Sequence, residues 1–179
     1  MIELRPFTPE FIEAILGGDR ERASELLDVE LPDEFPREGE KRFLALRLRQ
    51  MGEDDRFLEW CPFAVVLDGR LIGNAGYHGP PGVNAVNNPE AIEIGYAIEP
   101  SYRHRGHATA AALELLRRAE ERGVRHYVAS CSPGNDASLA VIRKLGFRHT
   151  GEAMDDEDGL ELVFELELGE KVDQWGDRH

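Results

Sequence analysis

The stretch YRHRGHAT at residues 102–109 decides how the chain around it folds. An alternating run from Ala91 to Ile98 precedes it and predicts a strand, whereas the residues from Thr109 to Arg122 place apolar side chains at helical spacing. The stretch is therefore a basic turn between a strand and the start of a helix. The first amides of a helix have no partner within the helix and carry partial positive charge, so such a turn is suited to holding phosphate groups.

The residue types in this turn favour an anionic ligand. Gly106 and Ala108 are small enough to let an anion approach the main chain. Cations at a helix N-terminus are disfavoured by about 0.3–1 kcal/mol, so two arginines there are better explained by a bound anion than by the helix itself. We expect the anion to contact Arg103, His104, Arg105, Gly106, His107, Ala108 and Thr109. An ordinary basic turn before a packing helix is the alternative, and a second motif is needed to decide.

That second motif is NDASLAVIRKLGF at residues 135–147. The preceding residues, 132–135, form a loop rich in turn-forming residues, and Leu139, Ile142 and Leu145 lie on one face of the helix that follows. Gly146 provides a C-terminal stop for that helix. A strand candidate, Tyr127 to Cys131, lies between the two motifs, so both occur in a strand–helix alternation.

Together the two motifs resemble those of the GNAT superfamily of N-acetyltransferases. The first is similar to the acyl-CoA pyrophosphate loop of that family, Gln/Arg-x-x-Gly-x-Gly/Ala, and the second to its Asn-x-x-Ser, helix and Lys-x-Gly-Phe segment. The resemblance covers about residues 1–168. It implies a mixed α/β fold, with about seven mostly antiparallel strands, a splayed fourth and fifth strand pair, and helices on both faces of the sheet.

The resemblance also implies acetyl-CoA as co-substrate, with its pantetheine arm between the splayed strands. The main chain of four residues of the fourth strand would bind this arm: Ile94, Tyr96, Ala97 and Ile98. Asn135 would bind the same arm from the opposite side, and Ser138 would lie near the acyl sulfur.

The proton donor that many family members use is absent from this sequence. They have a tyrosine four residues before the glycine of Gly-Phe, and Ile142 occupies that position here. In the branch that resembles the RimJ/RimL ribosomal-protein N-terminal acetyltransferases, the serine is proposed to interact with the sulfur instead, which makes Ser138 the candidate for an acid or sulfur-stabilising group. A hydroxyl that satisfies main-chain groups in the first helical turn is the alternative.

Glu93 is the best candidate for a general base, acting directly or through water. It alternates with apolar neighbours along its strand, so a solvated strand residue is the alternative. His78 is a weaker candidate for the base, and Cys131 reads as a buried structural thiol because no paired base is evident. We expect no metal site, because His104 and His107 lack further ligands.

Length and composition limit the number of domains, the partners and the location that the protein can have. The chain has 179 residues, which fits a single domain, here 1–168, followed by a C-terminal tail at 169–179. A net charge of −14 argues against a nucleic-acid partner, and no apolar run approaches the roughly 20 residues of a membrane span. Two cysteines and the lack of a signal-peptide pattern favour a cytoplasmic location.

Outside the two motifs, the sequence predicts the order β-α-α-α-β-β-β-α-β-α-β-β. The first strand begins at Ile2, and Thr8 caps the first helix. A helix is expected after Asp19, and apolar residues between Phe43 and Met51 indicate another helix that ends near Gly52. The other expected elements are a hairpin at 63–77 around Asp68-Gly69, a loop at 79–89, and strands at 147–153 and 160–168 around an acidic turn at 155–159.

The acceptor is predicted to be a primary amine, most simply the α-amine of a protein or peptide N-terminus. An α-amine costs roughly 3.4 kcal/mol less than a lysine side chain to deprotonate at neutral pH, which suits a site without an evident strong base. A small-molecule amine, an antibiotic, or a catalytically silent acyl-CoA sensor are the alternatives. Residues 28–36, Trp60 and residues 79–89 are the expected acceptor walls. Trp175 would anchor the tail on the domain or on a second subunit, which leaves a homodimer open.

Overall fold

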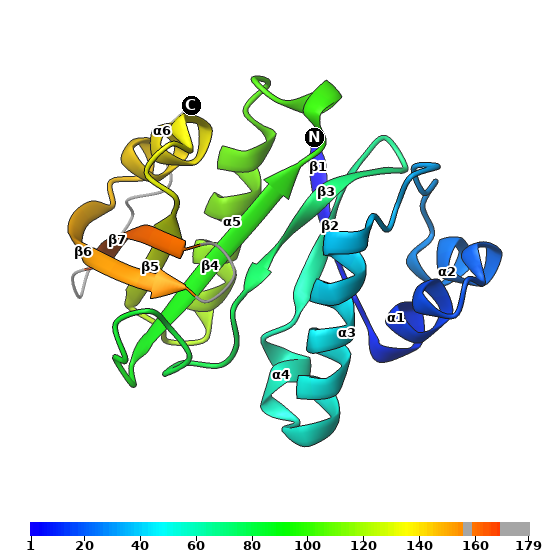
Figure 1. Ribbon diagram of the computed structural model, residues 1–179, viewed down its shortest axis with the longest axis horizontal. Coiled ribbons are helices and arrows are strands. Elements are labelled where there is room, and N and C mark those ends of the chain that lie inside the picture. The colour runs from blue at the N-terminus through cyan, green and yellow to red at the C-terminus, as the bar shows by residue number, and fades with distance from the viewer. Residues whose placement is uncertain (156–158, 169–179) are drawn as a thin grey trace.

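A computed structural model gives the fold and describes residues 1–155 and 159–168 (Figure 1). The strands are β1 (Ile2–Pro6), β2 (Pro62–Leu67), β3 (Arg70–Tyr77), β4 (Ala91–Ile98), β5 (His126–Cys131), β6 (Arg148–Asp155) and β7 (Gly159–Glu167). The helices are α1 (Pro9–Leu16), α2 (Arg20–Leu27), α3 (Glu38–Glu53), α4 (Arg56–Glu59), α5 (His107–Glu121) and α6 (Asp136–Lys144). All the predicted elements occur in the predicted order, to which the structure adds α4 and a 3₁₀ turn. The expected hairpin tip and C-terminal tail lie outside the described residues.

The strands form one seven-stranded sheet in the order β1-β2-β3-β4-β5-β7-β6. Every neighbouring pair is antiparallel except β4 and β5, which are parallel. Asp68 and Gly69 both have positive φ, 49° and 76°, as expected for the two central residues of the predicted hairpin turn. The predicted mixed sheet is therefore confirmed.

The parallel pair separates partway along its length. β4 pairs with β5 only over residues 91–93, whereas its pairing with β3 continues to Ile98. Beyond Glu93 one edge of β4 therefore has no neighbouring strand among the described residues, and the two strands diverge as predicted (Figure 1). This divergence opens the sheet beside the turn at 102–109.

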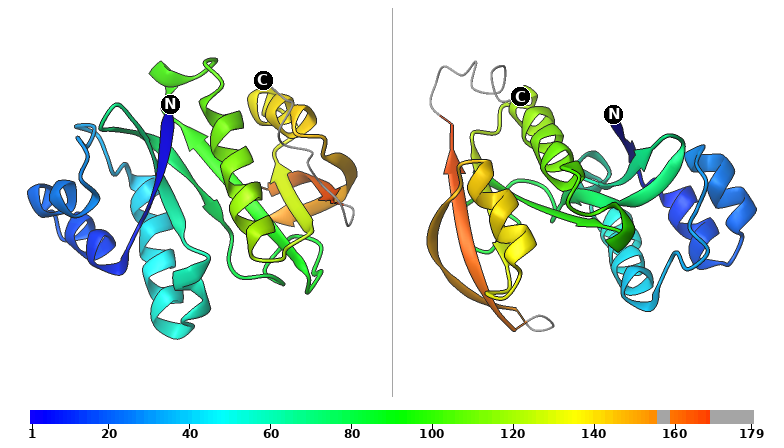
Figure 2. Two further views of the ribbon diagram at one scale, coloured as in Figure 1. Left: turned by 180° about the vertical axis from the view of Figure 1, so that it is seen from behind. Right: turned by 90° about the horizontal axis from the view of Figure 1, so that it is seen from above.

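Helices cover both faces of the sheet, as expected. Figure 2 shows α5 across one face, with α6 beside it, while α3 lies on the other face. The buried side of α5 is the predicted alanine- and leucine-rich stripe: Ala111, Ala112, Leu115, Leu116 and Ala119. The Tyr77 hydroxyl donates to the Leu115 carbonyl at 2.7 Å, which links β3 to α5.

Three helical features differ from the sequence prediction. Helix α3 begins at Glu38, five residues before Phe43, the first apolar residue that indicated it, because Glu40 accepts a hydrogen bond from the Arg37 amide and caps a polar first turn. Helix α4 and a 3₁₀ turn at Pro100–Tyr102 are additions. Each has four residues or fewer, which is too short to show helical periodicity in a sequence.

Candidate active site

A cavity of about 440 Å³ lies where β4, the turn at 102–109 and the start of α6 meet. Its lining contains most of the predicted cofactor residues: Tyr96, Ala97, Ile98, Arg103, His104, Gly106, His107, Ala108, Thr109, Asn135 and Ser138. Tyr102, Ala137, Ala140 and Val141 complete it. The fold thus brings together two motifs that lie about 30 residues apart, whereas Ile94, Arg105 and Glu93 are not part of the lining.

The main chain of the basic turn presents unpaired amides. His104 and Gly106 have positive φ, 60° and 82°, and Gly106 precedes α5 without any side-chain cap. Within residues 1–155 and 159–168, the N–H groups of residues 104–109 have no protein acceptor, and the first helical bond runs from the Ala110 amide to the Gly106 carbonyl at 3.0 Å. Main chain that alternates between right- and left-handed conformations forms anion-binding concavities of this kind.

The two arginines of the turn differ in position. The Nε of Arg103 donates to the Ile98 carbonyl at 2.8 Å, so this side chain is anchored beside the cavity. The guanidinium of Arg105 lies over the Tyr102 ring, 5.8 Å from its centroid, and the residue is exposed. Arg103 is therefore held in place beside the cavity.

The unpaired edge of β4 presents alternate residues to the gap. The Glu93 carbonyl accepts from the His78 amide, and the Glu99 amide donates to the Ile72 carbonyl, so odd-numbered residues face β3. A Cβ on Gly73 would lie 2.1 Å from the Ala97 carbonyl oxygen, which confirms that this carbonyl faces β3. By alternation, the main chains of Ile94, Tyr96 and Ile98 face the gap. The Ala97 carbonyl faces β3 although the residue lines the cavity, so its expected main-chain contact with the pantetheine arm stays a prediction.

Asn135 and Ser138 meet at the start of α6. The Oδ1 of Asn135 accepts from the Ser138 amide at 3.1 Å and caps the helix, which leaves its amide nitrogen for a ligand. The Ser138 hydroxyl has no hydrogen-bond partner among the described residues. The capping role considered for this hydroxyl therefore belongs to Asn135.

Tyr96 contributes a side chain that the sequence analysis treated only as main chain. Its hydroxyl donates to the Ser138 carbonyl at 3.3 Å, across the gap between β4 and α6. Burial raises the pKa of this phenol, so it remains a proton donor at neutral pH. The sequence signal was the spacing of Tyr96, two residues after Ile94, which places both side chains on the same face of β4.

Glu93 lies at the point where β4 and β5 diverge. It is 2% exposed, which rules out the solvated strand residue considered above. One carboxylate oxygen accepts from the Ala85 amide at 2.7 Å; the other accepts from the Ser130 hydroxyl and lies 3.5 Å from Nδ1 of His78. The loop at 79–89 therefore does reach this side of the sheet, where a base would meet an acceptor amine.

Arg47 of α3 also belongs to this side of the sheet, and the sequence analysis did not single it out. It is buried, and its Nη1 donates to the His78 carbonyl. The buried residues of α3 are Leu44, Arg47 and Met51, at helical spacing. An arginine inside an apolar helical stripe was the signal that could have identified it.

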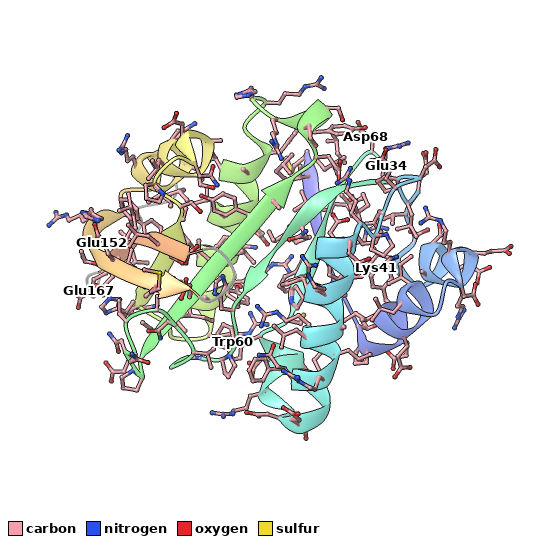
Figure 3. The ribbon with its side chains drawn as sticks, in the orientation of Figure 1. Glu34, Lys41, Trp60, Asp68, Glu152 and Glu167 are labelled. Atoms are coloured by element: carbon pink, nitrogen blue, oxygen red, sulfur yellow. The ribbon has the colours of Figure 1, made fainter. Side chains whose placement is uncertain are left out.

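Two residues considered above are part of the core. Trp60, which is labelled in Figure 3, is 7% exposed. Its ring packs edge-on against Tyr77, and the guanidinium of Arg122, the residue after α5, lies over it. It therefore lies on the α5 side and is not an acceptor wall. Cys131 is a buried free thiol, as expected, and burial raises its pKa.

Neither a metal cluster nor a membrane helix is present in the part of the chain that the structure describes. Residues 1–155 and 159–168 contain no group of three or more histidine, cysteine or acidic side chains placed to hold an ion. None of the described helices is both long and apolar enough to span a bilayer.

Comparisons with known proteins agree with the geometry. A family model for the acetyltransferase (GNAT) domain matches residues 2–148. YdaF of Bacillus subtilis, a candidate ribosomal N-acetyltransferase, is 35% identical over 92 residues, which are 51% of this chain and 48% of YdaF. The chain matches between about a third and a half of the length of its curated relatives.

Solved structures share the fold across nearly the whole chain. RimL, a ribosomal L7/L12 alpha-N-protein acetyltransferase in complex with coenzyme A, has a TM-score of 0.63 and 17% identity, and covers 93% of this chain and 94% of its own. A phosphinothricin acetyltransferase from Sinorhizobium meliloti in complex with acetyl-CoA has a TM-score of 0.62 and 22% identity, with 96% and 90% coverage. At such identities the likeness establishes the fold.

Proposed function

Because the chain belongs to the acetyltransferase (GNAT) family, we propose that it is an acetyl-CoA-dependent N-acetyltransferase that acts on a primary amine. The observation that carries the proposal is the set of unpaired amides at residues 104–109, which open into the cavity beside the unpaired edge of β4. These groups fit the diphosphate and the pantetheine arm of acetyl-CoA. When bound, this co-substrate supplies the activated acetyl thioester.

In this proposal, residues on one face of the sheet bind acetyl-CoA and residues on the other face deprotonate the amine. On the α5 side, Arg103 and the amides of the turn bind the diphosphate, and the Asn135 amide nitrogen donates to the arm. At the gap, the main chain of β4 positions the acyl group, and the hydroxyls of Ser138 and Tyr96 are available to protonate the departing sulfur. On the opposite face, Glu93 takes the proton of the attacking amine, with His78 beside it.

The proposed acceptor is the α-amine of a protein or peptide N-terminus. This acceptor is the easier one to deprotonate, and YdaF and RimL carry names of ribosomal-protein acetyltransferases. A small-molecule amine is the second candidate, since the phosphinothricin enzyme shares the fold. We also propose a cytoplasmic location, which fits two free buried cysteines, and a homodimer as one form of assembly.

The experiment has two arms. Calorimetry compares acetyl-CoA with S-acetylpantetheine, which has the same thioester but no phosphate; we expect acetyl-CoA to bind at least about 100-fold more tightly, because only it reaches the amides of the turn. A thiol-release assay then screens peptides, polyamines and aminoglycosides for acceptor-dependent turnover. Binding without turnover of any amine would identify a silent acyl-CoA sensor, and absence of binding at millimolar acetyl-CoA would refute the proposal.

Glu93→Gln tests the general base. Glutamine keeps an oxygen that can accept from the Ala85 amide but cannot take a proton, so we expect the fold and acetyl-CoA affinity to persist while kcat/KM for the amine falls by about 10²–10⁴. Rescue of the loss at higher pH, where the amine is already neutral, is the expected signature of a missing base. A loss that is the same at every pH would assign Glu93 a structural role.

A further inference from the structure

Two charged side chains are buried in the described part of the chain, Arg47 and Glu93. Glu93 has hydrogen-bond donors around its carboxylate, but Arg47, at 8% exposed, has no carboxylate within 4.0 Å among the described residues. A buried charge without a counter-charge is costly, because the protein does not replace the water that solvated it. Burial lowers the pKa of this guanidinium, which nevertheless stays protonated at neutral pH.

The contacts of Arg47 are all with neutral groups. Its Nη1 donates to the His78 carbonyl and, at 2.9 Å, to Oε1 of Gln50, and its guanidinium lies 5.2 Å from the centroid of the Phe43 ring. Its Nε is buried and has no acceptor in the part of the chain that the structure describes. Dipoles and a ring face therefore stabilise the cation in part, but its Nε lacks an acceptor and its charge lacks an anionic partner among the described residues.

Both buried charges contact the same residue. Arg47 contacts the carbonyl of His78, and the Glu93 carboxylate lies 3.5 Å from its imidazole. Only one histidine residue therefore separates the guanidinium from the carboxylate, on the face of the sheet that α3 covers (Figure 1). The unpaired amides of residues 104–109 lie at the other end of β4, so this pair of charges belongs to the acceptor and not to the acyl carrier.

We propose that the amine acceptor carries a carboxylate near its amino group and that Arg47 binds this carboxylate while the amine faces Glu93. The inference rests on the proposed function and specifies its substrate class. An amine and a carboxylate a few bonds apart match a cation and an anion on either side of one residue. Binding would give Arg47 its missing counter-charge and its Nε an acceptor. The carboxylate is either the α-carboxylate of a free amino acid or the acidic side chain of an N-terminal residue.

The test uses two pairs of acceptors that differ in one charge. Alanine is compared with alaninamide, and the peptide Asp-Ala-Ala-amide with Asn-Ala-Ala-amide, by thiol release at saturating acetyl-CoA. We expect the wild type to favour the charged member of one pair by about tenfold or more in kcat/KM, which also identifies the source of the carboxylate. In Arg47→Gln this preference should fall to about one, and Arg47→Lys should keep part of it.

The matched control is Arg49→Gln, which removes the same charge from the exposed side of α3, where Arg49 pairs with Glu53. It should keep the wild-type preference. If Arg47 only holds α3 against His78 at the end of β3, its loss would lower kcat/KM for both members of a pair equally, and the inference would be wrong. A wild type that turns over amines without favouring the charged member of either pair overturns it without any variant. An enzyme that binds acetyl-CoA but acetylates no amine in a broad screen would instead defeat the proposed function, and this inference with it.

Discussion

Replacement of Arg103 by glutamine should weaken acetyl-CoA binding without affecting a thioester that lacks phosphate. The Arg103 guanidinium lines the cavity and is anchored through Nε to the Ile98 carbonyl at 2.8 Å. The anchor matters because a free arginine loses up to about 2 kcal/mol of rotamer entropy when it binds a ligand, and part of that loss has already occurred here. The remaining nitrogens of the group are available for the diphosphate.

Coulomb's law gives the size of the effect. At a separation of about 5 Å, one pair of unit charges contributes about 0.8 kcal/mol in a water-like medium and about 3.3 kcal/mol at an effective dielectric constant of about 20. Arg103 is exposed at the rim of the cavity, which argues for the lower part of this range. We therefore expect a loss of about 1–2 kcal/mol, or about 5- to 30-fold in Kd.

Calorimetry of acetyl-CoA and S-acetylpantetheine, at about 0.1 M and 0.5 M salt, checks the prediction. The loss should appear for acetyl-CoA alone and shrink at the higher salt, because screening reduces the contribution of an exposed charge. Arg117→Gln is the control, since Arg117 lies further along α5 and pairs with Glu114 and Glu121. An equal loss for both thioesters, or a loss independent of salt, would refute an electrostatic contact with the diphosphate.

Three further outcomes are expected. Ser138→Ala should lower kcat about tenfold or more while the Kd for acetyl-CoA stays within about twofold, because the hydroxyl is needed only as the sulfur departs; stopped-flow turnover equal to that of the wild type would contradict this role. Tyr77→Phe removes the bond to the Leu115 carbonyl and should reduce the free energy of unfolding by about 0.5–1.5 kcal/mol, seen as a fall of roughly 2–5 °C in Tm; an unchanged Tm would show that the bond contributes nothing net. Burial raises the pKa of Cys61 from 9.0 to about 11, so between pH 9 and 11 the thiol ionises in the unfolded chain first and stability falls as the pH rises; urea melts should show a shallower decline for Cys61→Ala, and parallel declines would rule the effect out.

The elements that could be predicted from the sequence are those with local causes. Thr8 caps α1 through the Phe11 amide, and Gly146 ends α6 with a φ of 90°, so both boundaries depend on residues within one turn. The basic turn is of the same kind, because its unpaired amides follow from a helix that starts without a side-chain cap. Most of the predicted cofactor residues belong to such locally determined segments, and most of them line the cavity.

The features that the sequence could not show depend on pairing between distant segments. The alternation of side chains along the strand predicted the face on which Glu93 lies. The burial of that face could not be predicted, because it results from contacts with the loop at 79–89 and with Ser130 of β5. The direction of the Ala97 carbonyl toward β3 could not be predicted, because the sequence does not say which edge of β4 pairs with β3. Arg47 was missed because an arginine in a helix is usually exposed, and its burial results from the packing of α3 beside His78.

The divergence of β4 and β5 explains why one short strand can serve both substrates. Up to Glu93 both edges of β4 are paired, so a carboxylate there can be buried and held by fixed donors. From Ile94 onward one edge is open, so main-chain groups that would otherwise bind a neighbouring strand are available to a ligand. A substitution that extended the pairing of β4 with β5 would therefore close the binding edge and leave Glu93 in place. The proposed general base and the proposed binding edge are thus consecutive on the same strand because the break in pairing falls between them.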